Sequence, residues 1–152
     1  MMSAETRKSR RSQAPRPSAS SSAVGHHRTR SDHKSEIAED YVELIDDLIE
    51  DTGEARAVDL AKHLGVTHVT VTKTIARLKA EGLVTSAPYR SIFLTNSGKK
   101  MAEFTRRRHQ TVLEFLIALG VPRPDAEADT EGIEHHISPR TLEAMKRHLN
   151  AR

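Results

Sequence analysis

The sequence predicts a mainly α-helical protein in which a winged helix-turn-helix domain precedes a second helical domain. Apolar residues recur at steps of three and four over most of residues 36–150, the spacing of amphipathic helices. Within 57–95, two short helical segments flank a glycine and are followed by two runs rich in β-forming residues. That order is typical of a winged helix-turn-helix.

The composition excludes several classes of protein. The chain has 152 residues, no Cys and 3% aromatic residues. It therefore has no disulfides, no cysteine-bound zinc or iron–sulfur cluster and no thiol nucleophile. The low aromatic content argues against a base-stacking platform. No apolar run approaches the roughly 18–20 residues of a membrane span, and no secretory signal opens the chain, so we expect a cytoplasmic protein with no membrane partner.

The positive charge is concentrated at the N-terminus. Residues 1–35 hold eight basic and two acidic side chains and therefore have a net charge of +6. Because the whole chain has a net charge of +3, residues 36–152 have a net charge of −3. The segment is rich in Ser and poor in large apolar residues, which predicts a disordered basic arm. Two interpretations of this arm stay open: a solubilising tail, or extra contacts to the phosphates of a nucleic acid. The pI near 9.4 reflects the arm rather than the remainder of the chain.

The first predicted helix covers residues 36–51. Ser35 is a suitable N-cap, and Thr52-Gly53 ends the helix. One apolar stripe is formed by Ile37, Tyr41, Leu44, Ile45, Leu48 and Ile49. Beside it lies an acidic flank of Glu36, Asp40, Glu43, Asp47 and Glu50.

The helix-turn-helix is predicted over residues 57–80. In the first helix, 57–64, we expect Val58, Leu60, Ala61 and Leu64 to face inward. Gly65 supplies the turn, Val66 packs into the core, and Thr67 caps a second helix with a buried stripe of Val71, Ile75 and Leu78. Residues 83–87 and 92–95 then form the hairpin, which completes a domain over 36–95.

Three further helices are predicted over 96–152, the second helical domain. The first covers 96–119, with Met101, Phe104, Val112, Phe115, Leu116 and Leu119 on one face, and ends at Gly120. The second begins at Pro124-Asp125 and continues to about residue 136. It contains Gly132, which costs about 1 kcal/mol in a helix relative to Ala; something should compensate, and close approach of another helix is one possibility. The last is capped by Ser138 and continues to about residue 150.

The second helix of the helix-turn-helix is the candidate DNA reader. Such a helix presents its N-terminal side chains to base edges in the major groove. The residues expected to face double-stranded DNA are Thr67, His68, Val69, Thr70, Lys73 and Arg77, with Arg90 at the hairpin tip. The alternative is that these are ordinary exposed residues and that the winged helix contacts protein.

A second constellation combines carboxylates with imidazoles. Glu131, Glu134 and His135 share one helical face, Asp40 and Glu43 are one turn apart in the first helix, and His109 lies at the rim of the long helix. Oxygen and nitrogen ligands without sulfur suit Mn²⁺ or Fe²⁺. Each piece alone is equally compatible with a solvated helix face.

These residues resemble the DtxR family of metal-dependent repressors, in its short manganese-responsive branch, the manganese transport regulators. The likeness lies in Asp40-Tyr41-Val42-Glu43, in an Arg-His-Gln segment at His109, and in the signature that starts at Glu131 and reads Glu-Gly-Ile-Glu-His-His-Ile-Ser. The separations also match: 69 residues from Asp40 to His109 and 22 from His109 to Glu131. The resemblance covers about residues 36–150 and does not extend to the arm.

The resemblance implies a homodimer in which residues 96–152 form a metal-sensing and dimerisation domain. It implies two Mn²⁺ ions per subunit, with Fe²⁺ as a possible substitute. One ion would be held by Asp40, Glu43, His109 and Glu134, and the other by Glu43, Glu131, Glu134 and His135. The implied function is repression of manganese uptake genes by metal-ordered binding to an operator, with no enzymatic activity and no small-molecule substrate.

Three alternatives stay open at this point. A regulator of the same fold could respond to iron or to a non-metal effector. A two-metal carboxylate–histidine cluster could also hydrolyse esters or phosphates, although no separate general base stands near it in sequence. A structural nucleoid protein would show little preference among DNA sequences.

Overall fold

The computed structural model of the chain describes residues 19–87 and 89–151, with side chains from residue 31 onward. It is mainly helical, as predicted. The elements, in chain order, are α1 (Ala19–Thr52), α2 (Ala57–Leu64), α3 (His68–Ala80), β1 (Val84–Thr85), β2 (Phe93–Leu94), α4 (Asn96–Ala118), α5 (Arg123–Ile133), the 3₁₀ turn η1 (Glu134–His136) and α6 (Pro139–Asn150).

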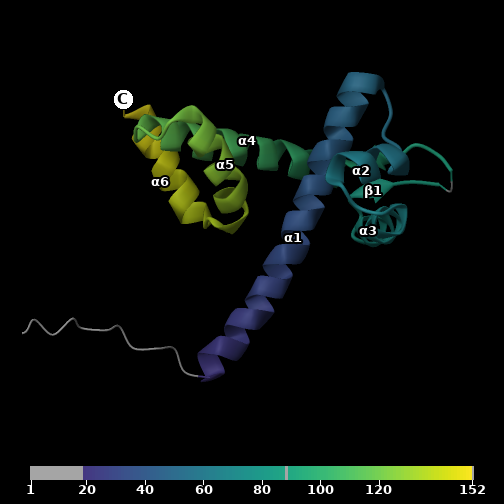
Figure 1. Cartoon of the computed structure of the whole chain (residues 1–152), viewed down its shortest axis with the longest axis horizontal. Coiled ribbons are helices and arrows are strands. Elements are labelled where there is room, and N and C mark those ends of the chain that lie inside the picture. Colours follow the sequence, from purple (N-terminus) through teal and green to yellow (C-terminus); the bar gives the residue numbers. More distant parts are fainter. Residues whose placement is uncertain (1–18, 88, 152) are drawn as a thin grey trace, which may run out of the picture.

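Helix α1 stands between two groups of elements (Figure 1). On one side lie α2, α3, β1 and β2, here called the hairpin half. On the other side lie α4, α5, η1 and α6, here called the helical half. Both halves pack against α1, and α4 begins beside β2 before it leaves for the helical half. One helix is thus common to both.

The hairpin half is a winged helix-turn-helix with an apolar core. Ile45 of α1, Leu60 of α2, Leu78 of α3 and Val84 of β1 are all buried in it. The turn between α2 and α3 places Gly65 at φ +64°, a left-handed conformation that glycine adopts without strain. These contacts fix α3 as an outer helix with one buried face.

The wing is a short hairpin. Val84 pairs with Leu94 and Thr85 with Phe93, and Ala55 adds a bridge to Ile92. The predicted runs were longer than these two-residue strands. The hairpin is held at its base by Gly98 of α4, where a Cβ atom would collide with the Leu83 carbonyl oxygen. A glycine is therefore required for α4 to begin this close to the wing.

In α4 the buried stripe differs from the predicted face. The stripe consists mostly of small residues and includes one charged residue: its members are Gly98, Ala102, Thr105, Arg108 and Val112. Phe104 and Leu119, which belong to the predicted apolar face, are 53% and 58% exposed. The face turned toward α1 accommodates Arg108, because α1 presents the acidic partner Glu39 there.

Four local predictions need correction. Helix α1 begins at Ala19, so part of the expected disordered arm is helical, because no proline interrupts the helix after Ala19; residues 1–18 lie outside the described part. Val58 is 61% exposed and lies at a cavity beside α3, and Val66 is exposed as well. The α-helix predicted to continue to about residue 136 ends at Ile133, and the following residues form the 3₁₀ turn η1. No group of the described chain approaches the space where a Cβ of Gly132 would lie, so no helix packs closely against it.

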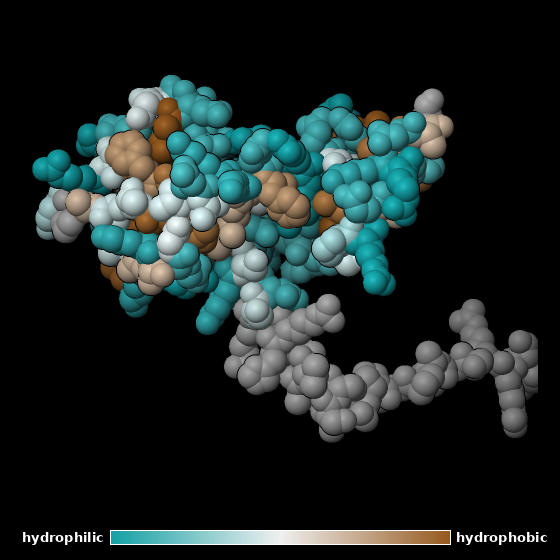
Figure 2. All heavy atoms as spheres, turned by 180° about the vertical axis from the view of Figure 1, so that it is seen from behind, coloured by the Kyte–Doolittle hydropathy of each residue, from teal (hydrophilic) through white to brown (hydrophobic). Residues whose placement is uncertain are grey.

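Side chains from residue 31 onward define the surface of both halves. On the face drawn in Figure 2, hydrophilic side chains predominate, and hydrophobic ones reach the surface at several places.

Among the helices of the described chain, none is long and apolar enough to cross a membrane.

Candidate functional site

A cluster of carboxylates and imidazoles lies where α1 passes α4 and η1. Asp40 and Glu43 come from α1, and His109 comes from α4. The end of α5 and the turn η1 supply Glu131, Glu134 and His135. The six predicted ligands thus come from separate elements that meet at one junction of the two halves.

Glu134 is the centre of this cluster and is only 2% exposed. Its Oε1 lies 3.0 Å from His109 Nδ1 and 3.8 Å from His135 Nε2. Glu131 Oε1 lies 3.7 Å from His109 Nδ1, and one ligand atom each from His109, Glu131 and Glu134 lie within 4.8 Å of one another. On the other side, Asp40 Oδ1 lies 3.4 Å from His135 Nε2.

This grouping differs from the one that the resemblance implied. His109 was expected beside Asp40, and His135 beside Glu131. The structure places His109 with Glu131 and His135 with Asp40, and Glu134 lies between the two pairs. The reason is the 3₁₀ turn, which directs His135 toward α1 while Glu131 stays on α5 and faces α4.

The cluster is electrostatically crowded. Burial raises the pKa of Asp40, and the nearby carboxylates of Glu131 and Glu134 add to the rise, although His135 opposes it. Burial also raises the pKa of Glu43, and the charge of Glu134 raises it further. Negative charges held this close together repel one another, so a cation at this place would be stabilised.

Two charged residues beside the cluster were missed by the sequence analysis. Glu39 Oε2 accepts a hydrogen bond from His135 Nδ1 at 2.6 Å and is paired with Arg108, which is 7% exposed. Burial on its own would raise the pKa of Glu39, but the hydrogen bond from His135 and the pairing with Arg108 outweigh it and lower the pKa. The hydrogen bond to Glu39 raises the pKa of His135 against the opposing effect of burial. The available signal was Arg108, the one charged member of a stripe of small residues in α4.

The residues present fit a divalent metal ion. Every predicted ligand offers oxygen or nitrogen, the donor set of a hard or borderline cation. Within the described chain, Glu134 Oε2 is buried without a hydrogen-bond partner. Arg108 Nε lies 4.0 Å from this oxygen, beyond hydrogen-bond distance. A buried carboxylate oxygen without a hydrogen bond is costly, and coordination to a cation would satisfy it.

The second site is the exposed face of α3. Thr67 caps the helix by accepting a hydrogen bond from the Thr70 amide at 3.2 Å, and its hydroxyl lies 3.0 Å from that of Thr70. His68, Val69 and Lys73 are exposed. These five predicted residues lie together over the first turns of α3.

Arg77 and Arg90 are placed differently from one another. The Arg77 guanidinium donates to the Lys34 carbonyl of α1 at 3.3 Å and pairs with Glu81, the C-cap of its own helix, at 3.7 Å. Arg90 is exposed in the wing. Of the seven predicted DNA-facing residues, Arg77 is therefore the one engaged with α1.

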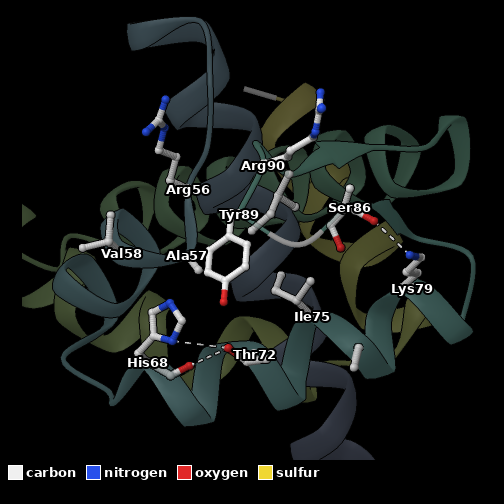
Figure 3. A pocket seen from close by; sticks show the side chains of 13 residues that line it. Arg56, Ala57, Val58, His68, Thr72, Ile75, Lys79, Ser86, Tyr89 and Arg90 are labelled. Carbon is white, nitrogen blue, oxygen red and sulfur yellow. Dashed lines mark hydrogen bonds between the residues drawn. The ribbon is translucent and has the colours of Figure 1, made fainter.

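A cavity of about 640 Å³ separates α3 from the wing (Figure 3). His68 and Thr72 line it from α3, and the Tyr89 side chain points into it from the wing. Lys79 Nζ donates to the Ser86 carbonyl at 2.8 Å and joins α3 to the wing at the rim. The cavity belongs to the same outer surface as the exposed residues of α3.

Two family models match the chain. The DNA-binding domain of the iron-dependent repressors matches residues 33–92, and their metal-binding and dimerisation domain matches residues 95–151. Together they cover more than half of the chain.

Curated relatives carry the same assignment. The transcriptional regulator MntR of Escherichia coli O157:H7 is 48% identical over 122 residues, which are 80% of this chain and 79% of the relative. The HTH-type transcriptional regulator MntR of Bacillus subtilis strain 168 is 38% identical over 107 residues, 70% of this chain and 75% of the relative.

Solved structures share the fold. A manganese-dependent transcriptional repressor in complex with manganese superposes with a TM-score of 0.66 at 29% identity. The manganese regulator SloR superposes with a TM-score of 0.65 at 25% identity. The chain covers 52% and 54% of these two structures, about half of their length, and 74% and 76% of it is matched.

The fold and the cluster define a class: DNA-binding regulators with a winged helix and a metal-binding helical domain. The chain belongs to the DtxR/MntR family of metal-dependent transcriptional repressors. The predicted fold class and family are confirmed, and so is the prediction that the chain is not an enzyme, because this family consists of repressors.

Proposed function

We propose that this chain is a manganese-responsive repressor whose dimer binds an operator when divalent metal fills the cluster between α1, α4 and η1. The observation that carries the proposal is the buried carboxylate of Glu134, which lies between His109 and His135 at the junction of the two halves. The regulators named MntR that the chain resembles support manganese as the metal.

The ligand set follows the observed pairs. His109, Glu131 and Glu134 would hold one ion. Asp40, Glu134 and His135 would hold a second ion, with Glu43 near Glu134 as a further carboxylate. Two Mn²⁺ ions bring four positive charges to four carboxylates. Fe²⁺ has the same preference for oxygen and nitrogen donors and is the competing metal.

A bound metal would neutralise the carboxylates of the cluster. The neutralisation would change how α1 lies against the helical half. Without a cation, two carboxylates about 4 Å apart repel by about 4 kcal/mol at an effective dielectric constant of 20. Asp40 and Glu43 belong to α1, whereas Glu131 and Glu134 belong to the helical half. Repulsion therefore acts between α1 and the helical half, and neutralisation draws them together.

Helix α1 carries this change to the DNA-reading surface. Tyr41, Val42 and Ile45 of α1 are buried in the core of the hairpin half, within the same turns that carry Asp40 and Glu43. Fixing α1 against the helical half therefore fixes α3. In a dimer, both copies of α3 reach one face of DNA only when they stand about 34 Å apart.

Base contacts are assigned to the first turns of α3 and phosphate contacts to the wing. Thr70 offers a hydroxyl, Lys73 a cation and Val69 an apolar surface for a thymine methyl group. Arg90 contacts the backbone or the minor groove. Arg77 needs to leave Lys34 and Glu81 before it can contact DNA, so its contribution depends on the position of α1.

The second copy is expected at the helical half. The matching family model describes this part as a metal-binding and dimerisation domain. Phe104 and Leu119 of α4 are large apolar side chains exposed on it. They are suitable for burial between two copies of the chain.

The decisive experiment is an operator-binding titration with Mn²⁺, Fe²⁺ and Zn²⁺ on the wild type and Glu134→Ala. The operator is first selected from random duplexes at saturating Mn²⁺. We expect Mn²⁺ to tighten binding by about 5–150-fold, the usual range of coupling between two sites. Glu134→Ala removes the shared ligand and should abolish the stimulation while a folded helical spectrum is retained.

The matched control is Glu127→Ala, which removes an exposed carboxylate from α5, the helix just before η1. It should keep the full stimulation by Mn²⁺. Binding of the wild type that is unchanged by Mn²⁺ and by a chelator would refute the proposal and favour a regulator with a non-metal effector.

A further inference from the structure

The contacts of His135 continue beyond the predicted ligands. Its two ring nitrogens face different partners: Nδ1 lies 2.6 Å from Glu39 Oε2, and Nε2 lies 3.4 Å from Asp40 Oδ1. Glu39 and Asp40 are neighbours on α1, so this helix contacts both sides of one imidazole. The ring is nearly buried, with a side-chain exposure of 5%.

The short distance decides where the proton lies. A neutral imidazole carries one N–H, and a carboxylate is an acceptor only. At 2.6 Å, two acceptors without a proton between them would repel, so Nδ1 carries the proton and donates it to Glu39. Nε2 then keeps its lone pair and faces Asp40 and Glu134, the side from which a cation would be bound.

Arg108 competes for the same nitrogen. Its Nη2 lies 3.1 Å from His135 Nδ1. The guanidinium is also paired with Glu39, through Nη1 to one carboxylate oxygen and through Nη2 to the other. A guanidinium is a donor only, and its Nη1 and Nη2 donate to the two oxygens of the carboxylate. Arg108 therefore fixes Glu39 from the α4 side and keeps its charge balanced in a place that excludes most water.

We propose that Glu39 is a positioning residue for His135: it holds Nδ1–H, and Arg108 holds Glu39, so that Nε2 is directed into the cluster. The inference rests on the proposed function, because it takes His135 as a metal ligand. A carboxylate that accepts the far N–H of a ligating histidine fixes its tautomer and orientation, and loss of such a partner usually costs about 10–100-fold in metal affinity. It also accounts for the observed pairing of His135 with Asp40.

The first test reads the tautomer without metal. Full-length protein with ¹⁵N-labelled histidine is freed of metal with a chelator, and long-range ¹H–¹⁵N correlations are recorded at a pH at which the ring is neutral. The wild type should show His135 with the proton on Nδ1, and Glu39→Ala should lose this preference. A proton on Nε2 in the wild type would overturn the inference.

The second test measures Mn²⁺ affinity from the loss of the free-ion paramagnetic resonance signal. Glu39→Ala should weaken binding by about 10–100-fold. Glu39→Gln keeps the shape and one acceptor oxygen, so it should lose less. If the alanine variant does not fold, the glutamine variant carries the test by itself.

A double-mutant cycle separates positioning from packing. Combined with His135→Ala, either Glu39 substitution should change the affinity by no more than about twofold, because its effect acts through the ring. An equal loss with and without His135 would overturn the inference, since it would show a merely structural role. If the wild type bound no Mn²⁺, the proposed function would fail. The measurement of the His135 tautomer, which needs no metal, would still test the role of Glu39.

Glu36→Ala is the matched control. Glu36 lies one turn earlier on α1, and its Oε2 lies 3.7 Å from the Nε2 of His136, the exposed neighbour of His135. It should leave the tautomer of His135 unchanged and shift the affinity by no more than about twofold. A loss equal to that of Glu39→Ala would instead mean that any negative charge on this face of α1 is sufficient, and it would contradict a specific role for Glu39.

Discussion

The two halves that share α1 are stabilised by different physics. The hairpin half contains the continuous apolar core, including Leu60, Val71, Leu78 and Val84. All the buried polar and charged residues of the described chain lie instead in the helical half: Thr105, Arg108, Thr130 and Glu134. The buried core of one half is therefore apolar, whereas the other half also buries charged groups that have to be balanced.

This difference shows how a stable reader can be combined with a responsive sensor. Apolar packing does not change with the metal content of the solution, so the shape of the hairpin half is constant. Buried charges respond strongly to any cation that enters, because the interior screens them weakly. We therefore expect substitutions in the two halves to differ in their dependence on metal.

The largest effect is expected from Arg108→Met. It removes the guanidinium from Glu39 and leaves that half-buried carboxylate with only its hydrogen bond to His135, at a cost of about 3–5 kcal/mol in the free energy of unfolding of the metal-free protein. Urea denaturation with a chelator present measures it. Adding Glu39→Gln should restore part of the loss, and no restoration would show that the cost came from packing of the long side chain.

Leu78→Ala tests the hairpin half. Leu78 is completely buried in the apolar core, so we expect a loss of about 2–5 kcal/mol. The loss should be the same with a chelator and with saturating Mn²⁺, measured by the same denaturation. A loss that shrank on addition of Mn²⁺ would contradict the division between the halves.

A matched pair of helix caps gives a smaller effect. Thr67 caps α3 and Ser138 caps α6, and each accepts a hydrogen bond from a backbone amide at 3.2 Å. Thr67→Ala and Ser138→Ala should each cost about 1 kcal/mol of stability. Only Thr67→Ala should also weaken DNA binding, which a mobility-shift titration at fixed Mn²⁺ would show. Equal DNA affinities of the two variants would remove Thr67 from the reading surface.

The smallest expected effect is on the pH dependence of the metal-free protein. The hydrogen bond to Glu39 raises the pKa of His135 above its usual value of about 6.5. The resulting stability is present below that value and is lost as the pH rises through the raised pKa. In His135→Gln, the free energy of unfolding should fall less over this range. An unchanged slope would contradict the proposed titration of His135.

The helices and caps were predictable because their signals are local. Thr67 and Ser138 precede periodic apolar runs, and Gly65 marks the turn, so nearest neighbours are sufficient to place them. Residue type and helical spacing singled out the six candidate ligands, and the family resemblance then implied their role, because periodicity alone does not distinguish a ligand from a solvated acid. Their assignment as ligands stays a prediction.

The pairing of Glu39 with Arg108 was not predictable from local pattern. The two residues are 69 positions apart, and a charged side chain on a helix is usually solvated. Polarity likewise does not reveal that Arg108 is buried on α4 while Phe104 is exposed. In both cases a partner distant in the sequence decides which side chain is buried.

The shared helix has a consequence for how this architecture can change. Core residues Tyr41, Val42 and Ile45 alternate with cluster residues Asp40 and Glu43 within the same two turns of α1. An insertion of one residue among them would rotate everything beyond it by about 100°, so one of the two faces would lose its register. Divergence of this chain therefore has to proceed by exchange of side chains at fixed length here.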